Sequence, residues 1–175
     1  MDVAALESAY DRFLDVARTS RDVVPPEGEW PPELVLAHVI VGDRLIAETA
    51  ARVLSGGQPR FDNRASQSAP YLEAVARAAG TWDGLLARVR QGGEELMATV
   101  ARIEPEHARI AVPSFVMDGD HIVVDGPAPL EQLVMAPAVI HLPGHAEQLK
   151  SYSRCSEPRG ASIAPRGHAG PDVRG

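Results

Sequence analysis

Residues 137–150, near the end of the chain, read PAVIHLPGHAEQLK and carry two histidines four residues apart, His141 and His145. Positions i and i+4 of a helix lie one turn apart on the same face, so the two imidazoles can converge on one point. A pair of metal ligands requires that geometry. A third histidine, His38, lies far upstream in another apolar segment and completes a candidate set of three ligands. The functional prediction depends on whether these three residues meet.

Apolar residues recur at helical spacings of three and four in four parts of the chain. They predict helices at about residues 3–18, 30–54, 71–103 and 129–152. The second of these carries apolar side chains on two neighbouring stripes, which indicates a helix buried on two sides, and His38 lies within that surface. A chain of 175 residues is long enough to bury one core of this kind.

Glycine and proline set the expected breaks between these helices. The pattern of the third helix stays in phase across Gly92-Gly93, so one long helix kinked there and two shorter helices both remain open. Pro137 is expected to kink or interrupt the last helix. Residues 58–70 are polar and irregular, and we expect a loop.

One short segment has the pattern of a β-hairpin. Strand-forming residues in 110–116 and 122–124 flank Asp118-Gly119-Asp120, which is a turn sequence. The predicted fold class is therefore all-α, a four-helix bundle over residues 1–154 with a small β-hairpin insertion before the last helix. Residues 155–175 are rich in Gly, Pro, Ser and Arg and are expected to form a disordered C-terminal tail.

The composition narrows the class of partner. The net charge is -7 and no long basic run occurs, which argues against nucleic acid as a partner. No apolar stretch approaches membrane-spanning length, and the N-terminus lacks the pattern of a signal peptide. Cys155 is the single cysteine, so an intramolecular disulfide is impossible. We expect a soluble cytoplasmic protein with no membrane partner and a small-molecule substrate.

Neutral imidazole is a good ligand for Zn²⁺, Ni²⁺ and related cations. Three such ligands with a vacant fourth position are typical of a catalytic site, where the cation can activate water, polarise an oxygen or bind a thiolate. Two alternatives remain open. A single histidine on an apolar stripe, such as His38, is more often a hydrogen-bonded core residue, and Pro143-Gly144 can either spoil or improve the convergence of His141 and His145.

The other histidines and the cysteine have plainer interpretations. His107 and His121 lie in a polar linker and in the hairpin turn, so we expect both at the solvent-exposed surface. His168 lies in the tail. Cys155, at the edge of the tail, is either a reactive thiol or a bystander.

Carboxylates on the histidine-bearing helices are candidates for a supporting role. Asp43, Glu48 and Glu147 can each orient an imidazole through a hydrogen bond, although such residues are more often ordinary solvated charges. The two tryptophans, Trp30 and Trp82, are expected to pack in the core.

The order of these pieces resembles the DinB/YfiT-like family. The resemblance rests on Trp30, the helix carrying Leu36-Ala37-His38, a long third helix, and the late HLPGHAEQL motif at 141–149, and it covers about residues 1–152. It implies an up-down-down-up four-helix bundle that binds a divalent metal ion. Pro143-Gly144 departs from the helical residues more usual inside this motif.

The resemblance also implies ligands and chemistry. Carried over residue by residue, the metal ligands are His38, His141 and His145, and zinc or nickel is the expected metal. Some members of the family resemble thiol S-transferases that use mycothiol or bacillithiol, and others resemble mycothiol-dependent isomerases; the Ala-, Arg-, Gly- and Pro-rich composition favours mycothiol. Two other hypotheses remain: a metal-free bundle that binds a small molecule or protein partner, and an interaction protein that acts as a homodimer.

Overall fold

The computed structural model describes the backbone of residues 1–155 and the side chains as far as Tyr152. The chain is mostly helical, as predicted, and also contains a three-stranded sheet. The predicted tail lies outside the described residues except for Cys155, which ends the last helix. The helical elements are α1 (Val3–Arg18), α2 (Pro32–Leu54), η1 (Arg64–Gln67), α3 (Ala69–Ala79), α4 (Trp82–Val100), α5 (Pro105–Ala108), α6 (Leu130–Ala136), η2 (Pro137–His141) and α7 (Leu142–Cys155).

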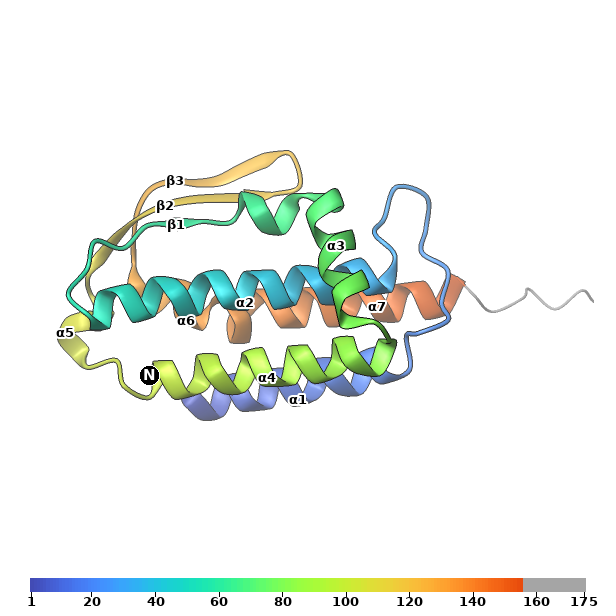
Figure 1. The fold of residues 1–175 in the computed structure, drawn as a ribbon, viewed down its shortest axis with the longest axis horizontal. Helices are drawn as coiled ribbons and strands as arrows, with labels where there is room; N and C mark the ends of the chain where they lie inside the picture. The colour runs from blue at the N-terminus through green and yellow to red at the C-terminus, as the bar shows by residue number, and fades with distance from the viewer. Residues whose placement is uncertain (156–175) are drawn as a thin grey trace, which may run out of the picture.

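The long helices α1, α2 and α4 lie along the long axis of the molecule, together with the continuous segment α6–η2–α7 (Figure 1). Helix α1 packs against α4 and α7, while α2 packs against α4, α6 and α7. The core between them is aliphatic and aromatic. Its fully buried side chains include Leu6, Phe13, Leu36, Leu96 and Tyr152.

Helix α2 is the most deeply buried helix of this group, as its two apolar stripes predict. Pro31 and Pro32 open it, where proline is tolerated because the first backbone N–H groups have no partner within the helix. Every residue from 34 to 39 is buried, and His38 is only 5% exposed. The histidine therefore lies inside the protein and needs a partner for its ring nitrogens.

The third predicted helix is interrupted at Gly80 and not at Gly92-Gly93, where the sequence left a kink or a break open. Helix α3 ends at Gly80, whose φ of 80° suits glycine, and Thr81 caps α4 by accepting a hydrogen bond from the Gly84 N–H. Gly92-Gly93 lies inside α4, which continues through it. The periodic pattern missed the break because the apolar residues of both helices stay in phase across it.

Gly93 is required by close packing rather than by backbone flexibility. A Cβ atom at this position would lie 2.8 Å from the ring of Tyr10 on α1. The missing side chain thus lets α1 approach α4.

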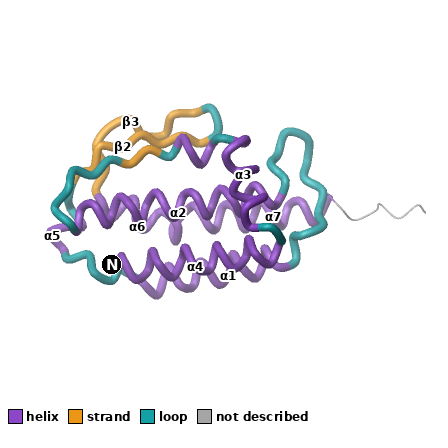
Figure 2. The backbone as a smooth tube through the Cα atoms, viewed as in Figure 1, coloured by secondary structure: helices purple, strands orange, loops and turns teal. Residues whose placement is uncertain are grey.

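The sheet contains the predicted hairpin and one strand that was not predicted. Strands β2 (Ala111–Asp118) and β3 (His121–Pro129) pair antiparallel around a turn in which Gly119 has a φ of 56°. Strand β1 (Phe61–Asp62) pairs parallel with β2, and η1 follows it, so the prediction of an irregular loop over residues 58–70 was wrong in part. The sequence does not reveal β1 because two residues are too few to show the alternating pattern of a strand. Figure 2 shows the sheet lying on one side of the helices.

The last helix is widened rather than broken. From Pro137 to His141 the backbone forms a π-helix, and the Leu142 N–H donates to the carbonyl five residues back, at Pro137. Pro143 is the second residue of α7, which continues η2 without a break, so its missing N–H removes one helical hydrogen bond to the preceding turn. A proline at that position in a regular α-helix would clash with the carbonyl four residues earlier, and a wider turn relieves that clash.

Two polar side chains face each other in the core between α1, α2 and α4. Asp43 is fully buried, and neither its carboxylate oxygens nor the Tyr10 hydroxyl makes a hydrogen bond of ordinary geometry. Burial raises the pKa of Asp43 from 3.8 to about 7, and the nearby Tyr10 hydroxyl only partly offsets this. Asp43 therefore gives the folded state an ionisable group inside its core.

We expect Asp43→Asn to change how stability depends on pH. Because the folded pKa of Asp43 lies above the unfolded one, wild-type stability falls as pH rises through the window from about 4 to 7 and levels off above it, by about 4 kcal/mol in all. The amide cannot ionise. In urea denaturation, the free energy of unfolding of the variant relative to that of wild type should therefore be higher at pH 8 than at pH 4.5. An equal difference at both pH values would contradict an ionisable Asp43 in the core.

Candidate metal centre

The structure brings His38, His141 and His145 together. They come from α2, η2 and α7, and the distances between ring centroids are 4.9 Å for His38–His141, 4.8 Å for His38–His145 and 4.7 Å for His141–His145. The three rings thus form a nearly equilateral triangle. The π-helical turn and Pro143 do not prevent the convergence of the two late histidines.

The ring nitrogens converge on a shared volume. One nitrogen from each ring lies within 4.8 Å of the others, and the Nε2 atoms of His38 and His141 are 2.8 Å apart. Ligand nitrogens around a tetrahedral Zn²⁺ are separated by about 3.3 Å, given Zn–N bonds of about 2.0–2.1 Å. The His38–His141 distance of 2.8 Å lies below that value and the upper limit of 4.8 Å lies above it, so the three imidazoles could hold a divalent cation.

His38 is held by the short helix η1, which follows α2 and β1 in the chain. Its Nδ1 lies 2.7 Å from the Ser66 carbonyl oxygen, which can only accept, so Nδ1 donates and Nε2 keeps its lone pair. Ser66 is anchored in turn, because its hydroxyl donates to the Asn63 carbonyl at 2.8 Å. The Asn63 side chain then bonds both the N–H and the carbonyl of Met117, at the point where the register between β2 and β3 shifts. The small sheet therefore fixes the orientation of His38.

The hydrogen in the contact between His38 and His141 belongs to His141. Since Nε2 of His38 carries only a lone pair, Nε2 of His141 must donate across the 2.8 Å separation. Both nitrogens can face one cation only after that proton has left this position.

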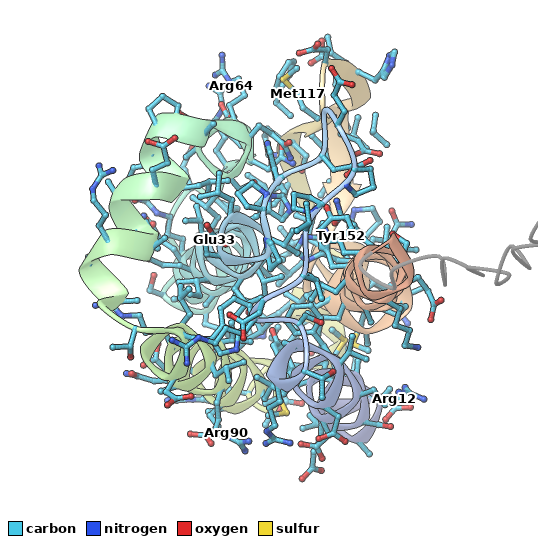
Figure 3. All side chains as sticks on the ribbon, turned by 90° about the vertical axis from the view of Figure 1, so that its right-hand side faces the viewer. Arg12, Glu33, Arg64, Arg90, Met117 and Tyr152 are labelled. Carbon is cyan, nitrogen blue, oxygen red and sulfur yellow. The ribbon has the colours of Figure 1, made fainter. Side chains whose placement is uncertain are left out.

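His145 and the neighbouring ring contacts complete the site. Nδ1 of His145 lies 2.8 Å from Oε1 of Gln148, one turn further along α7. The Trp30 ring lies 5.3 Å from the His38 ring, so this tryptophan, which packs partly against the core as predicted, also covers a candidate ligand. Figure 3 views this end of the molecule, with the labelled Tyr152 between α7 and α2.

His38 is buried and His141 and His145 are half-buried, and this desolvation favours the neutral imidazole, which is the form that binds metal. Desolvation lowers the pKa of His38 to about 4, helped by His145 and opposed by the Ser66 bond and by Asp118. It lowers the pKa of His141 well below its ordinary value, and the two neighbouring histidines act in the same direction. It also lowers the pKa of His145, against the opposing effects of Gln148 and Asp118.

Gly42 determines how closely His141 can approach α2. It lies one helical turn after His38, and a Cβ atom at Gly42 would lie 3.4 Å from Cε1 of His141. Any larger side chain there would push the ring away. At Gly144, by contrast, an added Cβ atom would meet open space.

The three carboxylates considered as supporting groups act elsewhere. Asp43 lies in the core with Tyr10. Glu48 pairs with Arg52 at 2.7 Å, and Glu147 pairs with Lys150 at 2.7 Å.

The other predicted positions lie outside the cluster. His121 is exposed at the start of β3, as expected. His107 is only partly exposed, in α5, and its Nδ1 is buried without a hydrogen-bond partner, so the expectation of a solvent-exposed side chain was wrong in part. Trp82 packs partly against the core. His168 and the side chain of Cys155 lie outside the described part of the chain.

Sequence reasoning missed Ser66, Gln148, Glu29 and Gly42. Gln148 carried a usable signal, because it lies three residues after His145 on the same helix. Ser66 acts through a backbone carbonyl, which any residue type would supply. Glu29 reaches Gln148 from a loop more than a hundred residues away, a contact that no local pattern reveals.

No family model, no curated protein and no solved structure matches this chain. Within residues 1–155, none of the helices is both long and apolar enough to cross a bilayer. The function therefore has to be inferred from the chemistry of the histidine cluster.

Substitutions of increasing size at Gly42 should weaken metal binding in steps. Gly42→Ala places a methyl group in van der Waals contact with His141 and should bind Zn²⁺ nearly as well as wild type. Gly42→Leu should displace the ring and lower the affinity at least tenfold, measured by competition with a chromophoric chelator. Gly144→Ala is the matched control. Equal affinities for all four proteins would show that His141 does not depend on this contact.

Proposed function

We propose that this chain is a DinB-like protein that binds one divalent cation, zinc or nickel, through His38, His141 and His145. The observation that carries the proposal is the convergence of three imidazoles from distant segments, with their ligand nitrogens within 4.8 Å of one another. Neutral imidazoles clustered without an intervening carboxylate match the ligand preferences of these two metals.

The proposed fold is the up-down-down-up four-helix bundle of that family. The directions of the helices support it: α2 and α4 run the same way, opposite to α1 and to the α6–η2–α7 segment (Figure 1). The hairpin before α6 then corresponds to an insertion between the third and fourth helices of the bundle. In this arrangement the ligands come from the second and fourth helices, which pack against each other.

The proposed activity is that of a metal-dependent enzyme acting on a small molecule. A cation bound by three imidazoles keeps an open position at which water or a thiol becomes a stronger nucleophile near neutral pH. The protein's own residues orient the imidazoles through Ser66 and Gln148 and shield one of them with Trp30. Such shielding limits access of water to the site.

The proposed co-substrate is a low-molecular-weight thiol, mycothiol or bacillithiol, in an S-transferase or isomerase reaction. Its support is the resemblance in sequence together with the three-imidazole site, which suits thiolate binding because metal coordination deprotonates a thiol. The alternative is a metal-free bundle that binds a small molecule or protein partner at the same place, and the two are separated by metal analysis.

The metal proposal predicts one zinc per chain. Protein purified without a His-tag should retain or take up one equivalent of Zn²⁺, measured by elemental analysis and calorimetry. His141→Ala should lose stoichiometric binding because two imidazoles remain. His121→Ala, at the exposed hairpin turn, is the matched control and should bind like wild type. Failure of the wild type to bind Zn²⁺ or Ni²⁺ after reconstitution would favour the metal-free alternative.

The thiol proposal predicts direct coordination. Titration of the cobalt-loaded protein with mycothiol, or with N-acetylcysteine as a simpler probe, should produce a thiolate-to-cobalt charge-transfer absorption that saturates at one equivalent. The alcohol analogue N-acetylserine should not produce it. A spectrum that stays unchanged with either thiol would rule out the S-transferase and isomerase chemistry while leaving the metal site intact.

A further inference from the structure

A chain of hydrogen bonds joins His145 to the loop between α1 and α2, which is distant from it in the sequence. Oε1 of Gln148 lies 2.8 Å from Nδ1 of His145, and Nε2 of Gln148 donates to Oε2 of Glu29 at 2.8 Å. The Tyr152 hydroxyl donates to the same Glu29 oxygen at 3.3 Å. We call Glu29, Gln148 and His145 the Glu29 relay.

The chemistry of these groups permits a single arrangement of protons. A carboxylate only accepts hydrogen bonds, so the amide nitrogen of Gln148 must face Glu29. The amide oxygen then faces His145 and only accepts, so Nδ1 of His145 must carry the hydrogen. Burial and the nearby Glu29 raise the pKa of Tyr152 to about 12, so its hydroxyl stays protonated and donates as well.

We propose that Glu29 is a positioning residue for the candidate metal centre. By fixing the orientation of the Gln148 amide, it holds His145 in the tautomer whose Nε2 lone pair is free to face the other two histidines. The use of that lone pair for a cation rests on the function proposed above, whereas the tautomer itself is independent of any metal. Hydrogen bonds of this kind also orient the ring and strengthen it as a ligand.

The relay complements the way in which His38 is held. There the acceptor is the backbone carbonyl of Ser66, which no side-chain substitution removes. For His145 the acceptor is an amide that can turn over, so a second group must decide which way it points. Glu29 is exposed on the loop between α1 and α2, and the next residue, Trp30, lies against the His38 ring. One loop therefore contacts the surroundings of two of the three histidines.

Glu29→Lys reverses the polarity of the relay and tests it. A lysine ammonium only donates, so the Gln148 amide should turn its oxygen toward it and its nitrogen toward His145. Nδ1 of His145 must then accept, which places the hydrogen on Nε2. We expect ¹⁵N-detected NMR of the metal-free protein at pH 8 to show the Nδ1–H tautomer of His145 in wild type and the Nε2–H tautomer in the variant. The affinity for Zn²⁺ should fall roughly 10–100-fold.

Two further proteins make the test specific. Glu27→Lys changes the same charge on the same exposed loop, two residues from Glu29, and should leave the tautomer and the Zn²⁺ affinity unchanged. The double exchange of Glu29→Gln with Gln148→Glu restores one amide and one carboxylate in reverse order. In it the carboxylate accepts from His145 directly, so the Nδ1–H tautomer and Zn²⁺ affinity should return.

The outcomes separate the relay from the proposed function. A tautomer that follows the pattern above supports the relay even if the wild type binds no Zn²⁺, in which case only the metal proposal fails. An Nδ1–H tautomer that persists in Glu29→Lys, or an Nε2–H tautomer in wild type, overturns the relay even if Zn²⁺ binds. If the wild type binds Zn²⁺, equal Zn²⁺ affinity in all four proteins overturns the positioning role of Glu29 at the metal centre, whatever the tautomer.

Discussion

Three imidazole rings share one small volume between α2, η2 and α7, and much of the surrounding structure serves to hold them there. Buried ring nitrogens need partners, because an unpaired polar group inside a protein is costly. His38 and His145 each use Nδ1 to reach an oxygen, on Ser66 and Gln148 respectively. Both therefore turn Nε2 inward, and His141 closes the triangle from the π-helical turn.

The π-helical turn lets His141 and His145 point the same way despite the prolines around His141. Prolines on both sides of His141 weaken regular α-helical hydrogen bonding, yet His141 and His145 must point the same way. Widening one turn between Pro137 and His141 removes the conflict with Pro143 and leaves the rings 4.7 Å apart. π-helical turns often lie at functional sites, because they change the direction of a side chain without ending the helix.

Two segments outside the long helices carry out the positioning. The segment after α2 adds a strand to the hairpin and presents the Ser66 carbonyl, while the segment before α2 presents Glu29 and Trp30. A short sheet and an exposed loop thus determine the orientation of side chains on the rigid helices. The helices determine where each ring lies, and the two segments determine how His38 and His145 are rotated and which ring nitrogen carries the hydrogen.

The sequence by itself determined the helical character of the chain, the burial of α2, the hairpin at Gly119 and the choice of His38, His141 and His145. The helices, the hairpin and the pairing of His141 with His145 follow from local spacing, because the 3.6-residue period and turn chemistry are properties of neighbouring residues, whereas the choice of His38 as the third ligand also drew on the family resemblance. Only the tertiary structure decided the break at Gly80, the strand at Phe61, and the roles of Gly42, Ser66, Gln148 and Glu29. These depend on contacts between segments distant in the chain, where a missing Cβ, a backbone carbonyl or a single carboxylate matters through what lies opposite it.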